Sequence, residues 1–217
     1  MKIKWNGHAS FTITAADGTV IITDPYDPAA YGGVLKYDPV SDKADAVLVS
    51  HEHGDHNYVE GLPGSPAVLR GSGQIGNIQV TGVDAFHDET GGTQRGRNVI
   101  FAFTVDGIRI CFVGDLGHQL SAEQVKSIGT VDLLLTPVGG TFTVDAQGAL
   151  QLAGAIKPRV VIPMHFKTRK CNLPIAGPED FLARMGSVKR LGKSEIEVLQ
   201  ATLPSGDTEA WLLEHAC

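Results

Sequence analysis

One eight-residue stretch, residues 50–57, constrains the fold and the chemistry of this chain more than any other feature. It reads Ser-His-Glu-His-Gly-Asp-His-Asn, and it directly follows a run of four apolar residues that predicts a short buried strand. His51 and His53 lie two positions apart, so an extended backbone points both imidazoles to the same face. The glycine after them permits a sharp turn into Asp55 and His56. One metal ion could not easily use all four donors at this spacing, whereas two neighbouring ions could share them.

Three more side chains of types that can bind metals follow predicted strands elsewhere in the chain. His87 ends an alternating run, Asp115 follows an apolar run and a glycine, and His165 ends another apolar run. Because α/β proteins gather their ligand-binding groups at the carboxyl ends of strands, we expect these three side chains to meet the histidine-rich stretch.

The pattern His-x-His-x-Asp-His, with these three residues after it in order, resembles the signature of the metallo-β-lactamase superfamily. The resemblance covers nearly the whole chain. It implies a single domain over residues 1–217 with an α/β (α+β) fold, a four-layer αβ/βα sandwich with the site at one edge. It also implies two divalent metal ions, held by His51, His53 and His87 for the first, by Asp55, His56 and His165 for the second, and by Asp115 for both. Short phrases around His8, residues 137–140 and residues 163–168 further resemble small metal-dependent hydrolases related to ascorbate-6-phosphate lactonase.

The donor set indicates the chemistry. Imidazole and carboxylate donors suit Zn²⁺, Mn²⁺, Fe²⁺ or Ni²⁺, of which we expect zinc. A pair of ions about 3.5–4 Å apart lowers the pKa of a bound water from about 15.7 towards roughly 7, so a hydroxide can attack without a serine or cysteine nucleophile. A carboxylate suits the shared position of Asp115 because each of its two oxygens can bind one ion. We expect Asp55 to be catalytic as well, by steering the hydroxide or passing on a proton.

Periodicity and turn residues predict the secondary structure around these ligands. Asp-Gly pairs at residues 17–18 and 106–107 predict hairpins. Ser121 and Gln124 form the pattern of a capping box that begins a short helix, and two further helices are predicted at residues 143–156 and 179–185. Strands are predicted at residues 2–5, 10–15, 19–23, 46–49, 67–70, 78–85, 99–105, 108–113, 132–136, 160–165, 196–199 and 208–213.

Several residues near the predicted site have two interpretations each. His8, at the lip of the first strands, either contacts the substrate or supports a ligand, and a lone histidine is usually structural. Asp24 ends a strand before a proline, where it either orients a ligand imidazole, as the resemblance implies, or only forms a turn. Arg95 and Arg97 belong to the Gly-rich loop 89–98, which either contacts the substrate through one of these arginines or is a mobile surface loop. His118 is a candidate pocket residue.

Charge is unevenly distributed along the chain. The net charge is −6, yet residues 157–193 contain nine basic and two acidic side chains, so this segment carries +7 and the remainder −13. Lys167 follows His165 closely and is the expected contact for an anionic substrate, since a cationic lip attracts anions. The alternative is that these side chains face bulk solvent. The net negative charge gives no support to binding of nucleic acid or of an anionic membrane.

The cysteine count bears on the compartment. Three cysteines without a Cys-x-x-Cys pair favour a reducing compartment, and we expect a cytoplasmic protein. No signal-peptide pattern and no apolar run long enough to span a bilayer occurs. A small molecule is the expected partner, and a homo-oligomer is compatible with this composition.

The departures from the family pattern narrow the expected reaction. Asp115 stands where the best-known β-lactamases use a cysteine ligand, which argues against lactam hydrolysis. The segment after His165 is short and partly strand-like, which argues against the helical glutathione-binding domain of glyoxalase-II-like thioesterases. We predict a hydrolase that cleaves an ester, lactone or phosphodiester bond in a small anionic metabolite. Two alternatives use the same ligands: an iron-dependent oxidoreductase that does not hydrolyse, and a metal-binding sensor without turnover.

Overall fold

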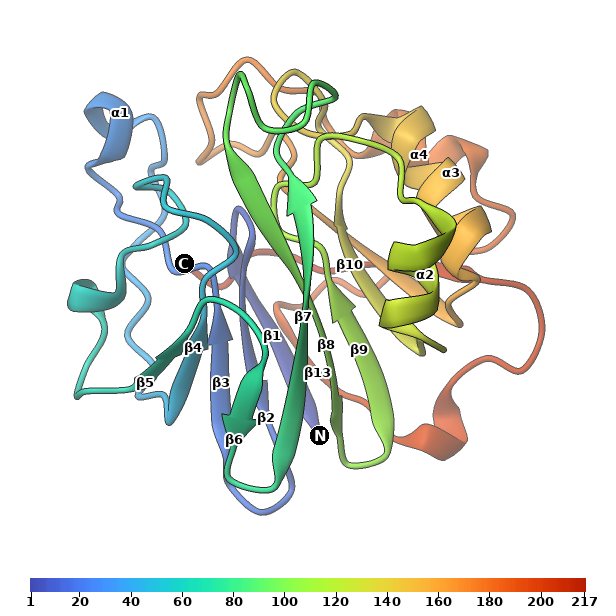
Figure 1. Cartoon of the computed structure of the whole chain (residues 1–217), viewed down its shortest axis with the longest axis horizontal. Helices are drawn as coiled ribbons and strands as arrows, with labels where there is room; N and C mark the ends of the chain where they lie inside the picture. The colour runs from blue at the N-terminus through green and yellow to red at the C-terminus, as the bar shows by residue number, and fades with distance from the viewer.

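Two β-sheets pack face to face to form the body of the molecule, which a computed structural model describes over residues 1–217 (Figure 1). The first sheet has six strands in the order β13-β1-β2-β3-β4-β5, and the second has eight in the order β12-β14-β11-β10-β9-β8-β7-β6. The strands are β1 Lys2–Gly7, β2 Ser10–Thr14, β3 Val20–Thr23, β4 Ala46–Leu48, β5 Ala67–Leu69, β6 Gly73–Ile75, β7 Ile78–Phe86, β8 Arg97–Val105, β9 Ile108–Phe112, β10 Leu133–Pro137, β11 Val160–Met164, β12 Val188–Arg190, β13 Glu195–Glu197 and β14 Glu209–Leu212. The predicted two-sheet α/β architecture is confirmed.

Alternating side chains of the first sheet serve two separate cores. Ile21 and Leu48 belong to the main core, a cluster of 50 buried apolar residues drawn from both sheets and the helices. Their neighbours Ile22 and Val47 belong to a smaller cluster of 11, which includes apolar residues of the loop 26–45. Because side chains alternate along a strand, a slip of one residue would exchange the two faces. The two cores therefore fix the register that positions the strand ends.

Helices cover the second sheet on one side, where α2, α3 and α4 lie at the right of Figure 1. The helices are α1 Ala30–Gly33, α2 Ala122–Ile128, α3 Ala146–Ile156 and α4 Glu179–Arg184, with 3₁₀ turns at Val59–Gly61 and Gln200–Thr202. The predicted capping box is confirmed, since the side chains of Ser121 and Gln124 each accept the other's backbone N–H. The second predicted helix begins later than residue 143, because the Asp145 carboxylate caps it by accepting from Gly148 N at 2.8 Å.

The other side of the sandwich carries loops instead of long helices. The loop 26–45 contributes Tyr26 and Tyr37 to the smaller core, and α1 within it has only four residues. This loop lacks a helical period, so the outer layer on this side is mostly irregular. Two edge strands, β6 and β12, are absent from the sequence-based prediction because β6 lies in a glycine-rich segment that predicts turns and the residues of β12 are all exposed, so neither shows an apolar pattern.

The strands that precede the predicted ligands end in register with one another. β3 and β4 run parallel in the first sheet, and β9, β10 and β11 run parallel in the second. β7 has the same direction as β9, since both are antiparallel to β8. The side chains beyond these ends converge, as described next. None of the helices is long and apolar enough to cross a bilayer.

Candidate metal centre

Two groups of metal-binding side chains meet beyond the strand ends. The ligand atoms of His51, His53 and His87, here called the first donor set, all lie within 4.8 Å of one another. The ligand atoms of Asp55, His56 and His165, the second donor set, lie equally close together, and His8 lies among them. The structure thus brings together six of the predicted metal ligands in the two groups that the resemblance implies.

Asp115 connects the two sets through a single oxygen. Its Oδ2 is 3.2 Å from the Nε2 atoms of His56, His87 and His165. Two ligands about 2.1 Å from one tetrahedral zinc ion would lie about 3.4 Å apart, so these separations match the edges of a coordination shell. The expectation was that each carboxylate oxygen serves one ion. Instead Oδ2 faces nitrogens of both sets, while Oδ1 is buried without a hydrogen-bond partner.

Unpartnered buried atoms show that the pocket fits a cation. The Nε2 atom of His51 is buried without a hydrogen-bond partner, which is costly unless a metal takes it, and the Nε2 atom of His56 faces only the carboxylates of Asp115 and Asp55. Burial lowers the pKa of His51 to about 2 and also lowers that of His53, so both imidazoles stay neutral, as metal ligands must be. Burial opposes protonation of His56 too, but Asp115 and Asp55 raise its pKa well above the ordinary value. The two carboxylates therefore draw positive charge into the centre.

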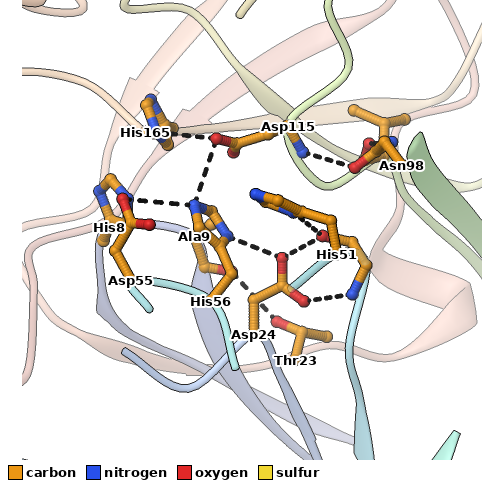
Figure 2. A network of polar contacts seen from close by, with 12 residues as sticks. His8, Ala9, Thr23, Asp24, His51, Asp55, His56, Asn98, Asp115 and His165 are labelled. Carbon is orange, nitrogen blue, oxygen red and sulfur yellow. Dashed lines mark hydrogen bonds and ion pairs between the residues drawn. The ribbon is translucent and has the colours of Figure 1, made fainter. Parts of the chain in front are cut away.

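One buried carboxylate orients a ligand of each set (Figure 2). His56 Nδ1 donates to Asp24 Oδ2 at 2.9 Å, which turns Nε2 towards the centre. Ser50 Oγ donates to the same oxygen and accepts from His51 Nδ1 at 2.9 Å. The structure gives Asp24 the orienting contact that the resemblance implied. Asn98, which the sequence did not single out, accepts the backbone N–H of Asp115 at 3.0 Å.

Backbone strain is concentrated around the centre. His8, Asp24 and His165 have φ values of 52°, 33° and 47°, a region that residues other than glycine rarely adopt. Such strain persists only where surrounding contacts overdetermine it, and it clusters at functional sites. Gly117 approaches the backbone of His87 so closely that a Cβ there would lie 2.3 Å from its carbonyl carbon. Side chains larger than hydrogen would therefore displace a metal ligand.

His8 lies behind the second donor set instead of in the substrate cavity. Its side chain is fully buried, and its Nε2 is 3.1 Å from Asp55 Oδ2. Its backbone carbonyl accepts the N–H of His165 at 3.0 Å, and the two rings are 4.1 Å apart. The predicted substrate contact is thus replaced by contacts to two metal ligands, because the turn between β1 and β2 places His8 inside the protein. Burial lowers the pKa of His8 to about 4.

A cavity of about 370 Å³ opens onto both sets. Its lining comprises Tyr31, His53, Asp55, His87, Arg95, Asp115, Phe142, His165 and Leu173. Arg95 is thus a lining residue, as one of the two interpretations of its loop required. Phe142 and Leu173 escaped sequence reasoning because they lie in irregular loops where no spacing marks them, and Tyr31 because the four residues of α1 are too few to show a helical period.

Two further candidates lie outside this lining. The Lys167 ammonium donates to the backbone carbonyl of Leu173 at 2.9 Å, so it supports the wall of the cavity, and its contact with an anion stays a prediction. His118 Nε2 accepts the backbone N–H of Phe86 at 3.1 Å. That contact ties the loop after β9 to the end of β7.

Comparisons with known proteins agree with this geometry. Residues 2–165 match a family model described as the beta-lactamase superfamily domain. A UPF0173 metal-dependent hydrolase of Anaeromyxobacter dehalogenans strain 2CP-1 is 32% identical, over 94% of this chain and 86% of its own length. A Thermotoga maritima structure, named as a zinc-dependent hydrolase of the metallo-β-lactamase superfamily, is 33% identical with a TM-score of 0.78, covering 98% of this chain and 99% of that one.

A more distant structure shares the fold alone. The diiron β-hydroxylase CmlA of Streptomyces venezuelae is 14% identical with a TM-score of 0.63, over 99% of this chain and 52% of its own. The hydrolase relatives are far more similar and match along nearly the whole chain. This chain belongs to the metallo-β-lactamase superfamily, among its UPF0173 metal-dependent hydrolases.

Proposed function

We propose that this protein hydrolyses an ester, lactone or phosphodiester bond in a small anionic molecule, using two divalent ions, zinc in the first instance. The observation that carries the proposal is the single oxygen of Asp115 that lies 3.2 Å from ligand nitrogens of both donor sets. Such an arrangement suits two adjacent cations better than one. When bound, the ions supply Lewis acidity and lower the pKa of water enough to make it a nucleophile at neutral pH.

The residues of the chain hold and orient the reacting groups. Asp55 and His53 line the cavity, so as metal ligands they would also face a bound substrate. Burial opposes ionisation of Asp55, but His56 and then His8 hold its pKa below the ordinary range. An ionised Asp55 can accept a proton from water or keep the water oriented towards the bond that breaks.

Water is the nucleophile that this cavity supports. No serine, threonine or cysteine is among its lining residues, and Cys111 and Cys171 are buried elsewhere. Burial raises the pKa of the Cys111 thiol to about 12, which disfavours the reactive thiolate. The anionic character of the substrate is supported by Arg95, the one cationic side chain in the lining.

The test combines metal analysis with a substrate panel. We expect the purified protein to contain close to two zinc ions per chain and to hydrolyse a member of a panel of carboxylated lactones, esters and phosphodiesters. Removal of metal with a chelator should abolish turnover, and added zinc should restore it. Iron with oxidation of an organic substrate would overturn the proposal in favour of an oxidoreductase. Bound metal without turnover on the whole panel would favour a sensor.

A further inference from the structure

We propose that the substrate joins an apolar arm, aromatic or acyl, to one anionic group, and that Phe142 and Arg95 recognise these two parts side by side. This inference rests on the proposed function and names the class of molecule that its cavity accepts. It narrows the small anionic metabolite predicted from the sequence to one that also carries an apolar arm.

The lining of the cavity combines two chemically different groups of side chains. Five of the nine lining residues are metal ligands, and three are the apolar side chains Tyr31, Phe142 and Leu173, here called the apolar side. Apart from the ligands, only the Tyr31 hydroxyl and the Arg95 guanidinium offer polar atoms from side chains. A substrate with many hydroxyls would lose its hydrogen bonds to water without replacement here, whereas an apolar arm would gain from leaving water.

Arg95 is the arginine near the centre that lacks a carboxylate partner. Arg70 forms an ion pair with Glu52 at 2.7 Å, and Arg97 forms one with Asp84 at 2.9 Å. Arg95 forms no ion pair with a carboxylate. Its guanidinium lies 5.8 Å from the centre of the Phe142 ring and donates to the Thr141 carbonyl at 3.3 Å. The remaining N–H groups of its fork are thus available for an anion next to an aromatic face.

The loop that carries Arg95 is held in place by one buried carboxylate. Asp88 directly follows the ligand His87 and is only 3% exposed. Its Oδ1 accepts from the backbone and hydroxyl of Thr90 and from Gly92 N, and its Oδ2 accepts from Gln94 N and Arg95 N, all at 2.7–3.0 Å. Asp88 therefore acts as a positioning residue that fixes Arg95 at a set distance from the metal centre.

The apolar side is also built before a ligand arrives. Thr141 Oγ1 donates to the Pro174 carbonyl at 2.7 Å, which joins the loop of Phe142 to the loop of Leu173. Lys167 Nζ donates to the carbonyl of Leu173 itself at 2.9 Å. A wall fixed in this way loses little conformational freedom on binding, which favours affinity for a ligand of matching shape.

Tyr31 completes the apolar side at the mouth of the cavity. It is 59% exposed, and it is the one exposed large apolar side chain that lines this cavity. Its loop is attached to the segment that carries Leu173, because Leu35 forms a β-bridge with Cys171 and Asn172 N donates to the Val34 carbonyl at 2.8 Å. An arm that lies across Phe142 would cover part of this exposed ring.

Binding of acylated glycines tests the inference without relying on turnover. The three probes are N-hexanoylglycine, its neutral carboxamide, and an acylglycine of equal length in which two methylenes are replaced by ether oxygens. For the zinc-loaded protein we expect calorimetry to show that N-hexanoylglycine binds about tenfold more tightly than either of the others, since each change removes one recognised part. Equal affinity for all three probes would overturn the inference.

Variants assign the two preferences to residues. Arg95→Ala should remove the preference for carboxylate over carboxamide and keep the preference for the hexanoyl arm. Phe142→Ala should remove the preference for the hexanoyl arm and keep the preference for carboxylate over carboxamide. Asp88→Asn should reduce the preference for carboxylate over carboxamide alone, whereas a purely structural defect would lower the affinity for all three probes together. Arg97→Ala is the matched control, since its exposed side chain pairs with Asp84 and should leave both preferences unchanged. Loss of the carboxylate preference in Arg97→Ala instead of Arg95→Ala would contradict the assignment.

Turnover of the corresponding O-acylglycolate esters separates this inference from the proposed function. If the binding preferences hold but no ester of any kind is hydrolysed, the class of ligand stands and hydrolysis is wrong. If esters are hydrolysed with no preference for arm or carboxylate, hydrolysis stands and the inference about the substrate is wrong.

Discussion

The two donor sets differ in charge, in exposure and in the way they are held. The first donor set consists of three imidazoles and no carboxylate, and its member His53 is half-buried at the cavity. The second set contains a carboxylate, its members are all buried, and His8 supports it from behind. Asp115 is common to both, but two of its three close nitrogens belong to the second set.

This difference has a structural origin. The first set lies at the ends of β4 and β7, close to where sequence patterns alone would place it. Both sets join the two sheets, but the second has further support from His8, which bonds both Asp55 and the backbone of His165. We infer that the first site binds its ion with its own imidazoles, whereas the second site depends on support from other residues.

The largest expected effect comes from removing the shared charge. Asp115→Asn should lower affinity for the second ion more than for the first, since the first keeps three imidazoles while the second loses the oxygen that two of its nitrogens face. A drop of more than about 100-fold in affinity for the second ion is expected, because ligands matter more than their supporting partners. Zinc per chain, measured by elemental analysis after dialysis against graded chelator, should fall from near two to near one.

The control for this variant is Asp84→Asn, an exposed carboxylate outside the centre. It should retain the metal content of the unaltered protein. Equal loss of both ions in Asp115→Asn would show that the two sets depend on the shared oxygen to the same degree, and the comparison would fail.

A smaller effect, confined to the second set, is expected from His8→Phe. The aromatic ring keeps the packing against His165 but cannot donate to Asp55, so the carboxylate loses its fixed orientation. Loss of such a supporting contact typically costs about 10–100-fold in metal affinity. Competition with a metal indicator should therefore show weaker binding of the second ion and unchanged binding of the first.

His215→Phe provides a matched control for this change. His215 also packs against aromatic rings, those of Trp5 and Tyr37, but it makes no contact with the donor sets. A decrease in affinity for both ions in His8→Phe, or an equal decrease in His215→Phe, would argue that His8 acts through general stability.

The same contrast explains what the sequence could reveal. The spacing of His51 and His53, the strand ends at His87 and His165, and the capping box at Ser121 are local patterns, and the structure has each in its expected place. Local patterns suffice because strand direction and alternation determine where such side chains point. The two-sheet architecture followed from the same periodicity together with the family resemblance.

What escaped prediction depends on contacts between distant segments. His8 and Asp55 are 47 residues apart, and no spacing signals that one will bond the other. The hydrogen bond from the Lys167 ammonium to the Leu173 carbonyl likewise has no signal in the sequence, and the contact of Lys167 with an anion stays a prediction. The apolar side of the cavity comes from irregular loops, whose conformation is set by tertiary hydrogen bonds instead of periodicity.

The smallest expected effect, from Ser50→Ala, probes the support of the first set. Ser50 Oγ accepts from His51 Nδ1 at 2.9 Å and donates to Asp24, so its removal leaves one buried N–H of a ligand imidazole without an acceptor. We expect about a tenfold loss of affinity for the first ion and little change for the second, because Asp24 still accepts directly from His56. Asp24→Asn is the contrasting variant, because Asp24 supports His51 through Ser50 and His56 directly. It should weaken the binding of both ions in the same indicator titration. If Ser50→Ala weakened the second ion as much as the first, Asp24 could not be transmitting separate support to each set, and the two sites would have to be treated as one rigid unit.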